Sequence, residues 1–444
     1  NNNILDIYLD REKNLWLGLD NGIDFISYNN AVKHIYPDYQ NEGSGYTAAI
    51  FQQDLYIGTS NGLYKAPLYA EKDLSFVKGH FDLVNNTQGQ VWNLSEVNGK
   101  LLMGHHDGAF VIENNNARAI DNSSGFWTFL PYSNVLPSSI MIAGTYQGIN
   151  FYDYSNGQFI NKNMSAHFES ARFVCLNDNS IWIAHPYKGI YRVQLKDNKP
   201  VTTNYAAKEG VLSTNGNYIF KIKNRVVLST ENGIYEYNES ADRFQSSAFY
   251  NSLFKNKNVR YLKEDGQGNI WFVFDKILGV VDMSTPKPQI IYFPELTNKF
   301  VAGFELIYPV NKNNVFIGGE RGFYHINFEN YKKIKYPLQV QITSVTAKNG
   351  GDSLLFGGYT GEVNEENGVP NKKTIAVSHA WNSFQFEFTS PVYAQQSNIE
   401  YSYILEGFEE QWSEFSRKNQ KEYTNLPAGQ YSFKIKARNN LGNE

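Results

Sequence analysis

Short apolar runs of about five residues recur along the chain, each bounded by polar turn residues. The first run, Leu15 to Leu19, has the length and composition of a strand buried on both faces. Asn21-Gly22 follows it and predicts a type I′ hairpin turn, in which both central residues have a positive φ angle. The pattern predicts one four-stranded antiparallel meander, with strands at residues 4–9, 15–19, 23–28 and 32–36.

Seven further copies of this hairpin follow, and the glycines that close the eight copies are 40 to 46 residues apart. These glycines are Gly22, Gly62, Gly108, Gly148, Gly189, Gly233, Gly279 and Gly322. Such a period is typical of propellers and solenoids. A single meander cannot cover its own apolar faces, so neighbouring meanders must pack against it. The sequence therefore predicts a β-propeller over residues 1–332, with eight blades, or seven if the first unit belongs to a propeller lying upstream.

The repeat stops after Tyr331, and alternating strands follow. Strict alternation, as in Phe384, Phe386 and Phe388, places one face of each strand in a core. We expect a β-sandwich over residues 333–444, with an exposed loop at 350–371. Its predicted strands are Val340 to Ala347, Thr374 to Ser378, and segments from Asn382, Ile399 and Gly429. Five aromatic residues there are predicted to be core or corner residues: Tyr401, Tyr403, Trp412, Tyr423 and Tyr431.

Composition agrees with an all-β protein that does not bind nucleic acid. Of the 444 residues, 41% are hydrophobic and 15% aromatic, enough for a large core. The net charge of −4, with no run of Lys or Arg, argues against a phosphate-binding surface. Cys175 is the single cysteine, which excludes an internal disulfide and a cysteine metal cluster. No run of 18 apolar residues is present, so we expect a soluble domain, trimmed from a larger precursor.

Three segments of the sandwich carry a resemblance to a known family. "NSFQFEFTSPVY", "IEYSYILEGFEEQW" and "YTNLPAGQYSFKIKARNNLG" resemble the triple-tyrosine domain of Bacteroidetes sensors, both hybrid two-component systems and single-chain membrane regulators. The repeats, with "EDGQGNIWF" as the best copy, resemble the regulator propellers of the same proteins. The resemblance implies a periplasmic sensor of oligosaccharide fragments that controls polysaccharide-utilisation genes. It also implies a homodimer, with the membrane helix and cytoplasmic signalling modules outside this chain, which would be a partial ectodomain.

A candidate ligand site follows from the propeller prediction. The first strand of every blade lines the central channel, and its first residues open onto the face that carries the hairpins between the second and third strands. Aromatic rings there suit stacking on sugars, and guanidinium groups pair with carboxylate or sulfate. Aligned units place Leu5, Thr47, Trp92, Trp127, Arg172, Tyr218, Arg260 and Phe304 at the strand starts, and His106, Tyr146, Tyr187, Lys188 and Arg321 in the hairpins.

The alternative for each of these residues is structural: aromatics wedged between blades and arginines paired with neighbouring carboxylates. We predict that replacing Arg172 and Arg260 together by alanine abolishes binding of an anionic ligand without unfolding the domain.

The sequence shows no catalytic constellation, so no enzymatic activity and no cofactor are predicted for this region. Asp10 and Asp265 are interpreted as turn formers, because the repeat explains them. A metal pair of His105 and His185 is the alternative to ordinary exposed loop histidines, and no metal is predicted. Besides a sensor, two functions remain open: an enzyme that cleaves polysaccharides in the same funnel, and a scaffold that binds other proteins.

Overall fold

The computed structural model describes residues 3–10, 13–38, 40–68, 73–76, 81–205, 213, 215–255, 257–333, 338–357 and 375–444. The chain forms two compact units. Unit 1 contains residues 1–29, 293–295 and 334–444, and unit 2 contains residues 30–292 and 296–333. The predicted domain boundaries at 332 and 333 remain a prediction, since residues 1–29 group with the C-terminal part.

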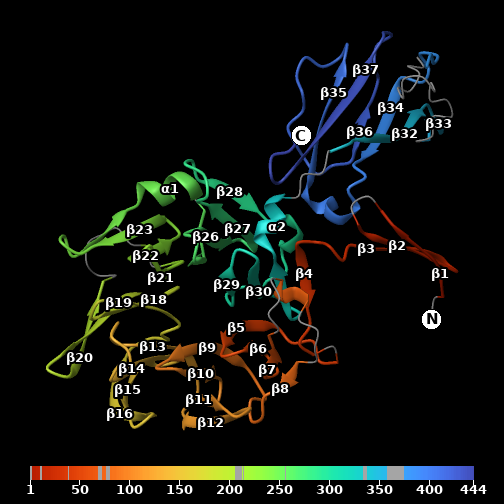
Figure 1. The fold of residues 1–444 in the computed structure, drawn as a ribbon. Helices are drawn as coiled ribbons and strands as arrows, with labels where there is room; N and C mark the ends of the chain where they lie inside the picture. The colour runs from red at the N-terminus through yellow and green to blue at the C-terminus, as the bar shows by residue number, and fades with distance from the viewer. Residues whose placement is uncertain are drawn as a thin grey trace. The chain divides into compact units, whose positions relative to one another are not determined.

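Within the described residues, unit 2 contains seven four-stranded antiparallel sheets, which we call blades 1 to 7 (Figure 1). The seven-blade alternative thus agrees with the structure, and the eight-blade alternative does not. The strands are β5 (Gly45–Phe51), β6 (Asp54–Thr59), β7 (Leu63–Pro67) and β8 (Asp82–Leu83) in blade 1; β9 (Val91–Val97), β10 (Lys100–His105), β11 (Gly108–Glu113) and β12 (Asn116–Asp121) in blade 2; β13 (Phe126–Pro131), β14 (Ile140–Thr145), β15 (Gly148–Ser155) and β16 (Gln158–His167) in blade 3.

The remaining blades follow the same order. They are β17 (Phe173–Asn177), β18 (Ser180–His185), β19 (Gly189–Lys196) and β20 (Lys199–Asn204) in blade 4; β21 (Tyr218–Ile222), β22 (Arg225–Thr230), β23 (Gly233–Asn238) and β24 (Arg243–Ser246) in blade 5; β25 (Tyr261–Glu264), β26 (Ile270–Phe274), β27 (Ile277–Asp282) and β28 (Gln289–Tyr292) in blade 6; β29 (Ile307–Asn311), β30 (Asn314–Gly318), β31 (Phe323–Ile326) and β4 (Val32–Ile35) in blade 7. Two short helices, α1 (Ala248–Phe254) and α2 (Phe328–Lys333), complete this unit.

Blade 7 closes the ring with strands from both ends of unit 2. Its outer strand β4 comes from the N-terminal side and pairs with β31, with Ile35 opposite Phe323. Backbone hydrogen bonds then join blade 7 to blade 1, from Gly45 N to Gly319 O at 2.9 Å and from Gly322 N to Gly43 O at 2.7 Å. The meander predicted over residues 4–36 is therefore wrong in its last strand, because β4 pairs in blade 7.

Neighbouring blades bury the apolar faces that the sequence pattern left uncovered. One core cluster joins Ile222, Val227 and Ile234 of blade 5 to Ile270 and Phe272 of blade 6. Every residue of β26 is buried. At roughly 1.5 to 3 kcal/mol for each fully buried large apolar side chain, such clusters stabilise the ring that positions the first strands.

The hairpins between second and third strands contain a different turn from the one predicted. Gly62, Gly108 and Gly233 have positive φ angles, but the residues before them do not, so the turns are not type I′. The side chain of Thr59 accepts the Asn61 N–H instead, at 3.0 Å. Thr145 and Thr230 repeat this bond. Pairs with two positive φ angles occur at other hairpins, as at residues 114–115, 197–198 and 223–224.

Unit 1 contains three described sheets. One consists of β1 (Ile4–Leu9), β2 (Leu15–Leu19) and β3 (Gly22–Ile26). The two others form the sandwich: β33 (Asp352–Phe356), β32 (Gln341–Lys348), β34 (Ser383–Thr389) and β36 (Gln420–Tyr423) in one, and β35 (Ile399–Glu406) and β37 (Ser432–Asn439) in the other. Residues 375–378 form no strand, contrary to the prediction, and Thr374 lies outside the described residues. In the predicted loop, 352–356 form β33 and 358–371 lie outside the described residues.

The tyrosines of the sandwich have the structural role that the sequence predicts. Tyr401 and Tyr423 are buried. The Tyr401 hydroxyl accepts the Ser390 N–H at 3.0 Å, and the Tyr423 hydroxyl donates to Glu409 at 2.8 Å. Trp412 is an exception, because its ring is 42% exposed and lies beneath the ammonium group of Lys436 on the surface.

Candidate functional site

In blades 2 and 3, a glycine near the end of the second strand allows the next blade to approach closely. A Cβ atom on Gly104 would lie 2.5 Å from the Phe126 carbonyl oxygen, and one on Gly144 would lie 2.2 Å from the Ala171 carbonyl oxygen. These distances are far below van der Waals contact, so any other residue there would push the neighbouring first strand away. The glycines therefore set the position of the residues that follow Phe126 and Ala171, which are Trp127 and Arg172.

A β-bulge then turns the side chain at the start of the first strand. Phe126 and Thr128 pair with consecutive residues of β14, which leaves Trp127 as the extra residue between them. Trp92 and Tyr46 occupy the same bulge in blades 2 and 1. Bulges redirect side chains out of the regular alternation of a strand. Tyr46, rather than the predicted Thr47, is thus the blade 1 counterpart, and Leu5 occupies the equivalent bulge between β1 and β2 in unit 1.

Four rings gather at the mouth of unit 2, the face on which the first strands begin. We call them the aromatic side: Tyr46, Trp92, Trp127 and Phe304. The centroid of the Phe304 ring lies 5.3 Å from Tyr46, 5.2 Å from Trp92 and 6.3 Å from Trp127. Trp92 and Trp127 are 5.1 Å apart. All four rings are half-buried, so each retains an accessible surface on which a ligand ring can stack.

The indole nitrogens of the aromatic side have hydrogen-bond partners. The Trp92 indole N–H donates to the Tyr146 hydroxyl at 3.0 Å, and the Trp127 indole N–H donates to the Ser170 hydroxyl at 2.8 Å. His106 Nδ1 also lies 3.0 Å from the Tyr146 hydroxyl. Tyr146 and His106 belong to the hairpins of blades 3 and 2, so the predicted hairpin row and the predicted strand starts share one face here.

Arg172 of blade 4 packs against the aromatic side. Its guanidinium carbon lies 4.0 Å from the centroid of Phe304 and 5.0 Å from that of Trp127. Burial lowers the pKa of Arg172 to about 10, and the Glu305 carboxylate opposes this effect. Cation–π contacts with partly desolvated rings stabilise by about 0.5 to 2 kcal/mol each. Arg172 thus packs on two rings, a contact that differs from the carboxylate pairing given as its alternative, and its part in ligand binding stays a prediction.

Blades 5 and 6 contribute what we call the polar side of the mouth: Asn217, Tyr218, Asn258 and Arg260. Tyr218 is 8% exposed, and burial raises its pKa while the nearby Arg260 opposes the rise. The Asn258 side chain packs on the backbone of Gly216, which joins the two blades. Within the described residues, the carboxamide atoms of Asn217, Oδ1 of Asn258 and Nε of Arg260 are buried without a hydrogen-bond partner.

Two predicted site residues have other contacts, although Tyr187 adjoins the polar side through Pro186, whose carbonyl oxygen accepts the Asn217 N–H at 3.4 Å. Tyr187 is 69% exposed, and its ring contact is with His185, 6.3 Å away. Arg321 forms an ion pair with Glu42 at 3.4 Å. Tyr46 and Glu305 were missed by the sequence alignment. Counting back from the strand-two glycines would have found Tyr46, because Thr47 pairs with Gly58 as Thr128 pairs with Gly144.

The hairpin histidines close turns. Nδ1 of His105 accepts the Asp107 N–H at 3.0 Å, and Nδ1 of His185 accepts the Tyr187 N–H at 3.2 Å, as threonine does in other blades. Burial lowers the pKa of both imidazoles. In the described ranges, no group of three or more His, Cys, Asp or Glu residues is arranged to hold a metal ion.

Asp10 and Asp265 are turn formers, as predicted. Asp265 accepts the Asn269 N–H at 2.9 Å and the Trp271 indole N–H at 3.0 Å. Asp10 accepts the corresponding groups of Asn14 and Trp16 at 2.8 and 3.0 Å.

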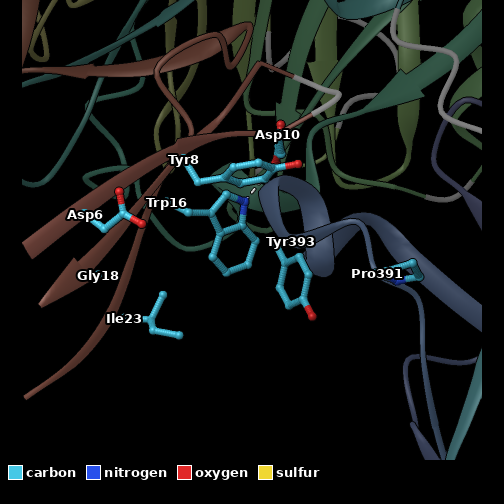
Figure 2. A pocket seen from close by; sticks show the side chains of 8 residues that line it. All are labelled: Asp6, Tyr8, Asp10, Trp16, Gly18, Ile23, Pro391 and Tyr393. Atoms are coloured by element: carbon cyan, nitrogen blue, oxygen red, sulfur yellow. Dashed lines mark hydrogen bonds between the residues drawn. The ribbon is translucent and has the colours of Figure 1, made fainter. Parts of the chain in front are cut away.

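Unit 1 has a cavity of about 590 Å³ at its N-terminal sheet (Figure 2). The Trp16 and Tyr393 rings meet edge to face there, 5.1 Å apart. Its predominantly apolar lining contains Asp6, Tyr8, Asp10, Trp16, Gly18, Ile23, Pro391 and Tyr393. The Asp10 carboxylate is already hydrogen-bonded within the turn and to Trp16. This cavity therefore offers a ligand fewer polar partners than the mouth does.

Comparisons with known proteins agree with this fold. Residues 392–444 match the Y_Y_Y domain family. The structure resembles the extracellular domain of the hybrid two component system BT3049 from B. thetaiotaomicron, with a TM-score of 0.69 and 20% identity over 98% of this chain and 59% of that one. It also resembles that of BT4673 from the same organism, with a TM-score of 0.53 and 18% identity over 97% and 60%.

A sequence relative is Histidine kinase P4 of Formosa agariphila, 24% identical over 210 residues, which are 47% of this chain and 15% of that protein. The chain thus spans about three fifths of the solved domains and a small part of the kinase. No helix in the described part of the chain is long and apolar enough to cross a membrane. In fold and in its Y_Y_Y domain, the chain therefore resembles the extracellular sensor domains of Bacteroides hybrid two-component systems.

Proposed function

We propose that this chain is the ligand-sensing region of an extracellular, periplasmic sensor in a two-component signalling system, and that it binds an oligosaccharide at the mouth of unit 2. The kinase modules of such a system lie outside this region, and the sandwich of unit 1 passes a change towards the membrane. Signalling requires that the ligand bind two arrangements of the protein with different affinity.

The observation that carries this proposal is the aromatic side of the mouth. A folded ring does not need four large side chains at one rim for its interblade cores, which lie deeper between the sheets. Half-buried rings whose indole N–H groups are already bonded present a flat apolar surface, and sugars stack on such surfaces. Their indole N–H groups and the Tyr146 hydroxyl hold the rings in fixed positions, so little freedom is lost on binding.

Calorimetric titration with a panel of neutral and acidic oligosaccharides tests the proposal. We expect at least one member to bind, and we expect Trp92→Ala to weaken that binding by roughly two- to tenfold, because a stacked ring contributes about 0.5 to 1.5 kcal/mol. Trp412→Ala is the matched control, since Trp412 is a half-exposed indole in the sandwich. The Trp412→Ala variant should bind the oligosaccharide with the same affinity as the unaltered chain.

Two results would count against the proposal. If no oligosaccharide releases heat or shifts the melting temperature, or if Trp92→Ala binds as well as the unaltered chain, the mouth is not the ligand site. Release of shortened products, detected by chromatography, would favour the enzyme alternative. Capture of a protein partner without any dependence on glycan would favour the scaffold alternative.

A further inference from the structure

We propose that Arg260 is the anion receptor of the mouth and that it pairs with a carboxylate or a sulfate ester of an acidic sugar. This inference rests on the proposed function. It assigns the two parts of the mouth different roles: the aromatic side stacks on the sugar ring, and the polar side binds its charged group. Arg172, which the sequence also predicted to bind an anionic ligand, has a structural role in this proposal.

The two arginines differ in what surrounds them. The guanidinium of Arg172 lies over the rings of Trp127 and Phe304. Among the described residues, no ion pair and no aromatic ring engages the guanidinium of Arg260, and its buried Nε has no hydrogen-bond partner. A buried donor without a partner costs about 1 to 3 kcal/mol, and more when it is charged. A planar oxyanion would satisfy Nε and a terminal nitrogen together.

Neighbouring residues add further buried polar atoms that have no hydrogen-bond partner in the described structure. The Asn217 side chain is fully buried, and neither its oxygen nor its nitrogen has a partner in the described structure. Asn258 precedes Arg260 by two residues, and its Oδ1 is likewise without a partner. Native proteins contain few such groups, and they occur where water, an ion or a ligand completes the bonding. Three residues of this kind on two adjacent blades therefore point to a bound polar group beside Arg260.

Charge at the mouth favours an anion. Glu305 is the carboxylate whose field acts on Arg172, and its Oε1 accepts the Gly303 N–H at 2.9 Å. Asp107 is a second carboxylate near this face, where its field acts on Tyr146, but within the described residues Arg260 itself has no ion pair that would neutralise it. The hydroxyl groups of a neutral sugar would not neutralise Arg260, whereas a uronate or a sulfate ester would.

The test compares three classes of oligosaccharide and three variants of the whole chain. The probes are alginate fragments, which carry carboxylates without sulfate, carrageenan fragments, which carry sulfate without carboxylate, and neutral laminarin fragments. The variants are Arg260→Ala, Arg260→Lys and the control Arg225→Ala. Arg225 has a 69% exposed side chain and is the first residue of β22, at the end of blade 5 away from the mouth.

We expect one acidic class to bind and Arg260→Ala to weaken it roughly tenfold or more, with the salt dependence reduced. Arg260→Lys should recover part of the affinity, since lysine keeps the charge but loses the fork of donors. Arg225→Ala should bind as the unaltered chain does. Which acidic class binds tells a carboxylate from a sulfate ligand.

Several outcomes overturn the inference. If Arg225→Ala loses as much affinity as Arg260→Ala, binding depends on the overall charge of the protein and not on Arg260. Unchanged affinity in Arg260→Ala, or binding of laminarin fragments alone, would reject Arg260 as anion receptor. If neutral binding is lost in Trp92→Ala but kept in Arg260→Ala, the proposed function stands and this inference fails. Circular dichroism shows whether Arg260→Ala is folded. If it is not, Arg260→Lys decides: if this variant binds as tightly as the unaltered chain, the bidentate contact is rejected.

Discussion

The aromatic side and the polar side of the mouth are built from equivalent positions of the same repeat, yet they differ in how far the protein satisfies them. On the aromatic side, rings from blades 1, 2, 3 and 7 pack on one another and their indole N–H groups are bonded. On the polar side, the described structure leaves polar atoms of Asn217, Asn258 and Arg260 buried without partners.

The two sides therefore contribute differently to the stability of the fold and to ligand binding. A cluster of rings that contact each other lowers the free energy of the folded state whether or not a ligand is bound. Polar atoms without partners raise that free energy until something pairs with them. The comparison therefore predicts that changes on the aromatic side reduce stability, while changes on the polar side reduce binding with little effect on stability.

The largest expected effect comes from Phe304→Ala. Its ring contacts Tyr46, Trp92 and Trp127 and lies under Arg172. We expect the free energy of unfolding to fall by about 3 kcal/mol, the low end for a phenylalanine because this ring is half-buried. Chemical denaturation measures the change. Tyr187→Ala is the control, since that exposed ring should change stability by less than about 0.5 kcal/mol; a similar small change in Phe304→Ala would break the comparison.

Acid should weaken the fold at the ring closure rather than at the mouth. Burial lowers the pKa of His325 to about 4, although the Asp73 carboxylate opposes the shift and Lys33 adds to it. The unfolded chain then binds a proton between about pH 6.5 and pH 4 that the folded chain does not, so stability falls as the pH falls through this range. The loss should approach about 3 kcal/mol.

His325→Gln tests this effect, because glutamine cannot be protonated in this range. Its stability should be lower than normal at neutral pH and should depend less on pH. His167→Gln, an exposed change on β16, should keep the normal dependence. An unaltered pH slope in His325→Gln would place the acid sensitivity elsewhere. Guanidinium groups stay charged throughout, so the charge of the polar side should not change over the same range.

The smallest effect compares the two arginines directly. Arg172→Ala removes contacts with two rings and should lower the free energy of unfolding by about 1 to 2 kcal/mol. Arg260→Ala removes a buried donor without a partner, which costs the folded state about 1 to 3 kcal/mol, so the free energy of unfolding should stay the same or rise. Thermal and chemical denaturation of both variants give these values. If Arg260→Ala is the less stable of the two, the guanidinium of Arg260 is a structural group and the comparison is wrong.

Much of the fold follows from local sequence patterns. The apolar runs, the spacing of the glycines and the alternation in the sandwich predict the strands, because each depends on neighbouring residues in the chain. The partner of β4 could not be predicted, since residues 32–35 read as the last strand of their own meander but pair with β31, almost 300 residues away. Hydrophobic pattern specifies that a strand is buried, but not which edge it joins.

The contacts among the predicted mouth residues were only partly foreseen, and their role in ligand binding stays a prediction. Alignment of the repeats found Trp92, Trp127, Arg172 and Arg260, because each follows from the start of a first strand. It placed Thr47 where Tyr46 lies, since a bulge adds one residue that the pattern does not reveal. The different roles of Arg172 and Arg260 depend on Phe304 from blade 7, and a contact between distant repeats leaves no signal in either repeat alone.

Hydrogen–deuterium exchange with and without a bound oligosaccharide tests most directly whether the mouth of unit 2 is the ligand site. The account predicts slower exchange at residues 44–47, 91–93, 126–128 and 258–261, where the first strands begin, and unchanged exchange at the opposite turns, 98–99, 197–198 and 223–224. Protection confined to those opposite turns, or to the sheet at residues 4–26, would contradict it.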